Sequence, residues 1–224
     1  MIAKPRLCLG IAVLLAALLA VAGAGPALGH GKEKHGEPPA EAVGAPEVVE
    51  PSSEGGAAEP FPIDISGAFA LVDHTGRSVT DADFRGGYML VFFGYTQCDS
   101  ICPVGLKRMA EAVDLLGEPG ERVRPILITV DPKNDTPEVL AAHLPTVHPR
   151  LVGLTGKPEA VEAAMKSYKV NAKLMGQSWK GTPVISHGSY IYLIGPDGAL
   201  LSILPPVLSS EAMAGIIARY LTQS

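Results

Sequence analysis

The hydrophobic residues of the chain fall into short blocks, and the clearest block is a run of seven residues from Tyr88 to Gly94. This run, YMLVFFG, has no charged position, which is typical of a central strand buried on both faces. After Pro103, a residue that suits the first turn of a helix, apolar residues recur every three or four positions. We therefore expect a buried strand, followed closely by a helix from Pro103 to about Leu116.

The rest of the chain repeats this alternation of strand and helix patterns. A β-hairpin is predicted before the buried strand, and a second hairpin around Pro196-Asp197-Gly198 is followed by a closing helix. This is the element order of the thioredoxin fold, so the pattern predicts an α/β, thioredoxin-like fold with an N-terminal β-hairpin extension. The expected strands are 69–72, 77–79, 123–130, 151–154, 189–194 and 199–204, and the further helices are 137–144, 158–168 and about 209–221.

The first 60 residues have a different pattern. Residues 1–29 resemble an export segment, because Lys4 and Arg6 precede an apolar stretch and small residues follow it. The uncharged stretch 7–24 is close to the ~20 residues that span a bilayer, so both a cleaved signal peptide and a retained membrane anchor remain open. Residues 30–60, rich in Gly, Pro, Ala and Glu, predict a disordered linker. The domain then extends over 61–224.

Composition and charge narrow the function classes. The chain is 47% hydrophobic and 18% charged, as expected for one globular domain with additional segments. Its net charge is -5, and no run of Lys and Arg is present that could follow a phosphate backbone. Nucleic acid is therefore not an expected partner.

Two cysteines remain once the export segment is set aside, Cys98 and Cys102. Outside the cytoplasm, thiols oxidise unless they are kept reduced or bind a metal. The pair lies at the predicted helix start, where the helix dipole favours thiolates. A CxxxC spacing brings both sulfurs to one side, where they can form a redox-active dithiol or bind a soft ion such as Cu(I).

His187 precedes the strand of the last hairpin, and a loop at that point of a thioredoxin fold comes close to the helix-start cysteines. Two thiolates and one imidazole suit three-coordinate Cu(I), with room for a fourth ligand when the ion is Cu(II). We therefore predict a copper site formed by Cys98, Cys102 and His187. The alternative is that His187 is only a hydrogen-bonded turn residue.

Three separated segments, LVFFGYTQCDSICP, VDPKNDTPEVL and SHGSYIYLIGPDG, resemble the Sco/SenC family of copper proteins over about residues 67–224. The resemblance implies copper delivery to the binuclear copper centre of cytochrome c oxidase, with Cys98, Cys102 and His187 as ligands. It implies two kinds of partner, the copper-bearing subunit of a terminal oxidase and upstream periplasmic copper donors. It also implies an exported protein at the periplasmic face of the inner membrane, and it favours the membrane anchor over cleavage.

The chain departs from the family pattern at three positions. Asp99 and Ser100 stand where the family usually has Pro-Asp, and Ser186 stands where Asp commonly precedes the histidine. These changes bear on copper affinity and redox potential more than on the identity of the ligands. The charge of Asp99 beside Cys98 disfavours the thiolate but helps to retain a cation.

A competing hypothesis uses the same two thiols in an enzyme. In a thiol-disulfide oxidoreductase, Cys98 would attack a disulfide and Cys102 would resolve the mixed disulfide, with the copper-ligand cysteines of the target subunit as the substrate. A peroxidase is less favoured: Thr96 stands near the cysteines, but no Arg is close in sequence.

Several further residues have two interpretations each. For Asp131 and Asp135, a turn and a helix cap are favoured over an acidic pair that orients His187 or contacts a partner. Trp179 is expected to pack, with a docking surface formed together with Lys180 as the alternative. His30 and His35 in the linker are expected to be solvated, with weak metal binding as the alternative.

Overall fold

The apolar run Tyr88–Gly94 forms β3, a strand whose residues are all buried. It pairs in parallel with β4 (Val123–Thr129) on one side and antiparallel with β8 (Ile191–Ile194) on the other. The prediction of a central strand is therefore confirmed. In this computed structural model the described residues are 64–222, so the predicted leader 1–29 and linker 30–60 lie outside them. Within that described range, no helix is both long and apolar enough to cross a bilayer.

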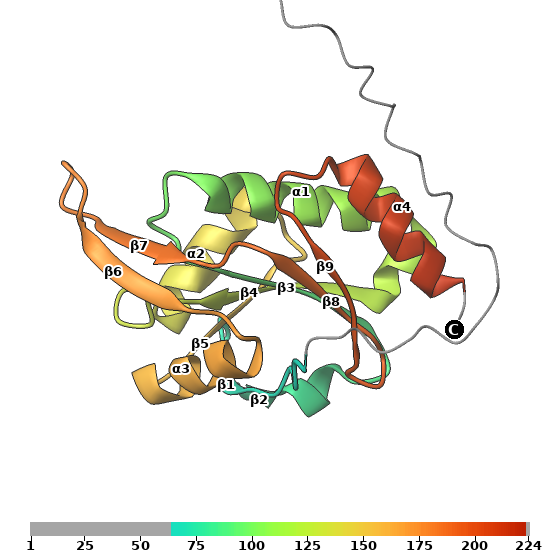
Figure 1. Cartoon of the computed structure of the whole chain (residues 1–224), viewed down its shortest axis with the longest axis horizontal. Helices are drawn as coiled ribbons and strands as arrows, with labels where there is room; N and C mark the ends of the chain where they lie inside the picture. Colours follow the sequence, from blue (N-terminus) through green and yellow to red (C-terminus); the bar gives the residue numbers. More distant parts are fainter. Residues whose placement is uncertain (1–63, 223–224) are drawn as a thin grey trace, which may run out of the picture. The chain divides into compact units, whose positions relative to one another are not determined.

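Seven strands form the main sheet, in the order β2-β1-β5-β4-β3-β8-β9 (Figure 1). The predicted N-terminal hairpin extends this sheet at one edge, where Val72 of β1 pairs with Thr155 of β5. The C-terminal hairpin forms the other edge. The remaining strands are β1 (Ala70–Asp73), β2 (Ser78–Thr80), β5 (Val152–Thr155) and β9 (Leu200–Leu204).

Helices cover both faces of the sheet. α1 packs against α4 and also contacts α2, and Figure 1 shows α1 and α4 on one side of the sheet and α3 on the other. The Tyr168 ring, which follows α3, packs edge-on against Phe93 and Tyr192. The helices are α1 (Ile101–Leu115), α2 (Pro137–Val147), α3 (Pro158–Ser167) and α4 (Ser210–Leu221), with 3-10 turns η1 (Asp81–Phe84) and η2 (Glu118–Arg122).

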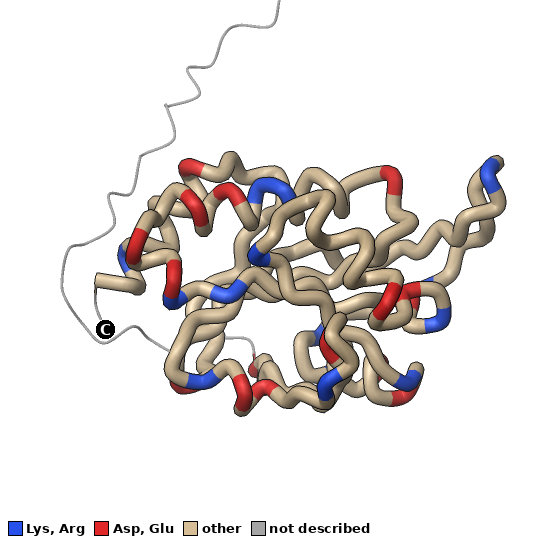
Figure 2. The backbone as a smooth tube through the Cα atoms, turned by 180° about the vertical axis from the view of Figure 1, so that it is seen from behind, with Lys and Arg blue, Asp and Glu red and all other residues tan. Residues whose placement is uncertain are grey.

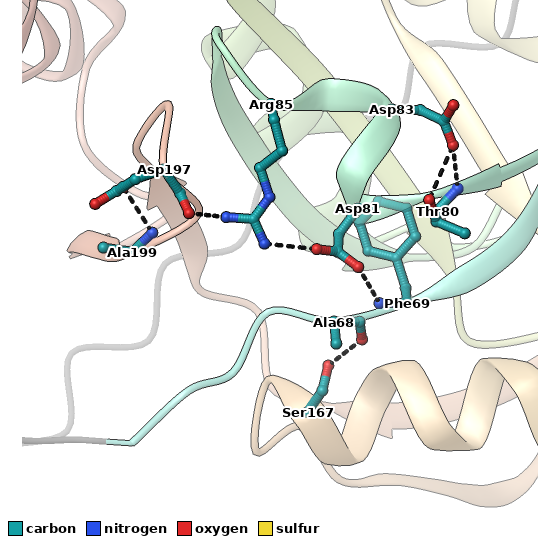
Figure 3. A network of polar contacts seen from close by, with 9 residues as sticks. All are labelled: Ala68, Phe69, Thr80, Asp81, Asp83, Arg85, Ser167, Asp197 and Ala199. Carbon is teal, nitrogen blue, oxygen red and sulfur yellow. Dashed lines mark hydrogen bonds and ion pairs between the residues drawn. The ribbon is translucent and has the colours of Figure 1, made fainter.

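Polar contacts attach the N-terminal hairpin to the core (Figure 3). The Arg85 guanidinium donates to the carbonyl of Asp197, in the turn between β8 and β9, and to the Asp81 carboxylate at 2.6 Å. That carboxylate also accepts a hydrogen bond from the Phe69 N–H. Arg85, the residue that follows η1, therefore joins the N-terminal hairpin to the turn of the C-terminal hairpin.

A second sheet was not predicted from the sequence. β6 (Ala172–Gln177) and β7 (Pro183–His187) pair antiparallel as a two-stranded ribbon, in a region that the sequence pattern left as a loop. The ribbon escaped prediction because most of its residues are polar or exposed, so it lacks the apolar alternation of a half-buried strand. Gly181 turns the chain between the two strands with a positive φ of 79°, a conformation that glycine adopts without strain.

Candidate metal centre

Both cysteines lie where β3 gives way to α1. β3 ends at Gly94, Cys98 lies in the loop, and Cys102 is the second residue of α1, which begins two residues earlier than the sequence pattern predicted. Ser100 occupies the N-cap position without a side-chain capping bond. The first N–H groups of the helix are therefore available to other acceptors, and the Cys98 sulfur is one of them.

The environment of Cys98 lowers the pKa of its thiol to about 4. The largest cause is the hydrogen bond from the Cys102 side chain; burial opposes it, and hydrogen bonds from the N–H groups of Ser100 and Cys102 add to it. The pKa of Cys102 is raised, because its thiol hydrogen-bonds to Cys98, is buried, and faces the negative charge of that sulfur. The reduced pair therefore holds one proton, on Cys102, and Cys98 is the thiolate.

His187 is the last residue of β7. Its Nε2 lies 3.6 Å from the Cys102 Sγ, and its Nδ1 lies 3.0 Å from the Gly188 carbonyl oxygen. Because a carbonyl only accepts, Nδ1 carries the proton and Nε2 presents its lone pair to the sulfurs. The histidine is thus part of the site, and it reaches the site from a strand end, not from the turn that the sequence predicted.

Tyr95 joins the histidine strand to the cysteine loop. Its hydroxyl accepts the Ile185 N–H of β7 at 3.2 Å. Burial is the main reason that the pKa of Tyr95 is raised, and a hydrogen bond from its hydroxyl to Cys98 contributes. The rings of Tyr95 and Phe92 both meet the imidazole of His187 edge-on, with centroids 6.1 and 6.4 Å away. These contacts fix the orientation of the imidazole ring.

Asp135 holds the same loop in place through hydrogen bonds. Its buried carboxylate accepts hydrogen bonds from the Thr96 N–H at 3.1 Å, the Thr96 hydroxyl at 2.5 Å and the Thr129 hydroxyl at 2.7 Å. The helix cap of α2 is Thr136. Asp135 is therefore neither a cap nor a partner of His187; it connects the end of β4 to the loop two residues before Cys98.

The other residues singled out in the sequence have simpler places. Asp131 forms the expected turn, with its carbonyl accepting the N–H groups of Asn134 and Asp135. Trp179 does not pack: it is 89% exposed at the ribbon tip, and the Lys180 Nζ lies 5.1 Å from the centre of its ring. His30 and His35 lie outside the described residues.

The three candidate ligands lie close together but are not arranged as a complete coordination shell. Neither Cys98 nor Cys102 forms a disulfide, Cys102 contacts His187, and Cys98 accepts a hydrogen bond from Cys102. In residues 64–222, no group of three or more His, Cys, Asp or Glu side chains is already arranged as a metal-holding set. The donor types themselves, two sulfurs and one imidazole nitrogen, are those that soft copper prefers over hard cations.

Comparisons with known proteins agree with this fold. The family model described as SCO1/SenC matches residues 57–222. Protein sco1 of Schizosaccharomyces pombe is 36% identical over 159 residues, which cover 70% of this chain and 60% of that protein. Protein SenC of Rhodobacter capsulatus is 36% identical over 157 residues, covering 70% of this chain and 71% of that protein. The chain thus spans only 60% of the length of its fission yeast relative.

Solved structures give the same result. The copper-bound ScoI of Bradyrhizobium japonicum superposes with a TM-score of 0.64 at 35% identity, covering 70% of this chain and 99% of that one. The copper-bound yeast Sco1 superposes with a TM-score of 0.64 at 27% identity, covering 72% and 91%. The predicted thioredoxin-like fold is confirmed, and the chain belongs to the SCO1/SenC family.

Proposed function

We propose that the protein is a copper chaperone that binds one copper ion through Cys98, Cys102 and His187 and delivers it to the binuclear copper centre of cytochrome c oxidase. The observation that carries this proposal is the 3.6 Å contact between the Cys102 Sγ and the His187 Nε2. It brings an imidazole from β7 to a dithiol at the start of α1. The copper-bound structures of ScoI and yeast Sco1 support the same cargo.

The residues are prepared for a soft cation. Cys98 is already a thiolate in the reduced protein, and binding removes the proton that Cys102 holds, as metal binding to thiols requires. The carbonyl of Gly188 fixes the tautomer of His187 that leaves Nε2 free to bind. Transfer to an acceptor then proceeds by replacing these ligands with those of the acceptor.

Titration of the reduced protein with Cu(I) tests the ligand set. We expect one copper ion per chain, and much weaker binding after Cys98→Ala, Cys102→Ala or His187→Ala, because each change removes one donor. A matched control is His143→Ala, which removes a histidine from α2 and leaves the three donors in place. With Cu(II), the thiolate-to-copper charge-transfer band should be present in the wild type and absent without the cysteines. Undiminished binding in both Cys98→Ala and His187→Ala would remove the proposal.

A second candidate function is supported by the unequal thiols. A thiolate at Cys98 beside a protonated Cys102 is the arrangement of a thiol-disulfide oxidoreductase. The Cys98 thiolate attacks a target disulfide, one sulfur of which leaves as a thiolate. Cys102 then loses its proton and attacks Cys98, which releases the second target sulfur and leaves a Cys98–Cys102 disulfide. The target, reduced by two electrons, would be the copper-ligand cysteines of the oxidase subunit.

His187→Ala separates the two functions. It removes a copper ligand but neither sulfur, so reduction of a test disulfide such as oxidised glutathione should survive it while copper binding falls. If the wild type reduces no disulfide, and its own Cys98–Cys102 disulfide has the low potential of a structural bond, the oxidoreductase function is excluded.

The place of action proposed here is outside the cytoplasm, at the periplasmic face of the inner membrane. The partners would be the copper-bearing subunit of a terminal oxidase and periplasmic copper donors upstream. The support is the export pattern of residues 1–29, which leaves both an anchored and a cleaved form open. Fractionation of cells and the mass of the exported protein decide between these forms.

A further inference from the structure

The β6–β7 ribbon carries an exposed apolar surface. Of the nine large hydrophobic side chains exposed in residues 64–222, four lie on this one ribbon. They are Leu174 (63% exposed), Met175 (63%), Trp179 (89%) and Val184 (42%), which we call the ribbon patch. Scattered single apolar residues are ordinary on a protein surface, but a group of large ones on one projecting element indicates an interaction site.

The charges that the ribbon itself carries have one sign. Residues 172–187 contain two lysines, Lys173 and Lys180, and no acidic residue, although the whole chain has a net charge of -5. The Lys180 Nζ lies against the Trp179 ring at the tip. The tip is basic in Figure 2, where it projects away from the mixed charges of the main domain. A binding partner with complementary charge would present carboxylates around an apolar face.

The ribbon also leads directly to the proposed copper ligands. Leu174 pairs with Ile185 and Ala172 pairs with His187, so these side chains share the face that carries the imidazole. A groove of about 550 Å³ runs along this face. Gln97, next to Cys98, lines it together with Leu174 and Ile185. Leu174 is the member of the ribbon patch that lies on this face, so a protein that covers Leu174 and fills the groove reaches Gln97, the neighbour of Cys98.

We propose that the ribbon patch is the docking surface for the protein that exchanges copper with this chain, and that this partner presents an apolar face bordered by Asp and Glu. The proposal rests on the proposed function. Trp179 is the expected anchor, because interface energy concentrates in a few residues and tryptophan is enriched among them. A lipid surface is the alternative for an exposed Trp-Lys tip, but it would contact the tip alone and leave the groove beside Gln97 unused.

Copper transfer tests the docking surface. The copper-loaded full chain is mixed with the soluble copper-site domain of the terminal-oxidase subunit from the same organism, and in parallel with a small Cu(I) chelator. We expect Trp179→Ala to slow transfer to the protein acceptor by about tenfold or more. Reversing the charge of Lys173 and Lys180 together (K173E/K180E) should slow it further at low salt and less at high salt. Transfer to the chelator should not change, because the three ligands remain.

Leu115→Ala is the matched control, since it removes an exposed apolar side chain from the end of α1, away from the ribbon. An equal slowing by Leu115→Ala, or no slowing by Trp179→Ala, overturns the proposal. All of these side chains are exposed, so the variants are expected to fold, and unfolding curves verify this.

The single tryptophan of the chain gives a second readout that does not depend on copper. With 5-fluorotryptophan incorporated, the protein has one fluorine resonance, and we expect the copper-free acceptor domain to shift or broaden it. Anionic phosphatidylglycerol vesicles should leave it unchanged; a response to vesicles and not to the acceptor overturns the proposal in favour of a lipid surface. If the wild type binds no copper, the proposed function fails, while this resonance still decides whether the ribbon docks the acceptor.

Discussion

Replacing Asp135 by alanine removes the carboxylate that ties the cysteine loop to the end of β4. Three hydrogen bonds disappear, two from Thr96 and one from Thr129, at a position that is fully buried. A hydrogen bond to a charged group contributes about 1.5–3 kcal/mol, and a buried donor left unpaired costs about 1–3 kcal/mol. The two hydroxyls can rotate toward other acceptors, but the Thr96 N–H is fixed by the backbone, so the contributions do not simply add.

We therefore expect Asp135→Ala to lower the free energy of unfolding by about 3 kcal/mol, a large part of the roughly 5–15 kcal/mol of a typical domain. Equilibrium urea unfolding measures it: with a slope near 2 kcal/mol per molar, the midpoint should fall by about 1.5 M. Because Thr96 lies two residues before Cys98, copper affinity should fall as well, although no ligand has changed.

The control for this prediction is Asp131→Ala in the same segment. Its carboxylate accepts a hydrogen bond from the Asn134 side chain at 2.7 Å and has no bond to Thr96, so the loss should be about 1 kcal/mol. Equal losses for Asp135→Ala and Asp131→Ala, or a loss below about 1 kcal/mol for Asp135→Ala, would refute the argument that the buried carboxylate holds the loop.

The remaining predictions concern the other contacts of the site. Tyr95→Phe keeps the ring but removes the hydroxyl that accepts a backbone N–H of β7. Urea unfolding should show a free energy of unfolding lower by about 1–2 kcal/mol, and an unchanged midpoint would contradict the role of this hydrogen bond in joining β7 to the cysteine loop. Gly94→Ala places a Cβ 2.9 Å from the Phe92 ring and 3.3 Å from the Cys102 sulfur, so we expect a loss of about 1–3 kcal/mol and weaker Cu(I) binding; a neutral effect on both would show that the strand end has room. Because the pKa of Cys98 is about 4, its thiolate is formed above that pH, and iodoacetamide should alkylate the reduced, copper-free protein at a rate nearly constant from pH 6 to 8. A rate that rises about tenfold per pH unit, as for a thiol of ordinary pKa near 8.5, would count against this assignment.

Much of the fold could be predicted because its signals are local. The seven buried residues of β3 have no charged member, and the turn at Pro196-Asp197-Gly198 separates two short apolar runs. Helix ends were harder to place. α1 begins at Ile101, ahead of Pro103, since the first turn of a helix tolerates proline at more than one position.

The sequence predicted the three donor residues of the candidate site but not the residues that hold those donors in position. Cys98, Cys102 and His187 carry recognisable chemistry, and the fold pattern places them at one end of the sheet. The roles of Tyr95 and Asp135 depend on contacts with Ile185 and Thr96, 90 and 39 positions away along the chain. Nothing in the sequence near a tyrosine or an aspartate specifies such a distant partner, so only the tertiary structure could assign them.

The donors of the proposed site belong to two separate sheets. The cysteines follow a strand of the seven-stranded sheet, whereas His187 ends a strand of the two-stranded one. An ion held by all three would act as a cross-link between the main sheet and the two-stranded ribbon. Amide hydrogen exchange in residues 172–187 should therefore slow when copper binds and quicken when copper leaves. The ribbon then has a more rigid and a less rigid state, and an acceptor protein that binds the ribbon can distinguish the two.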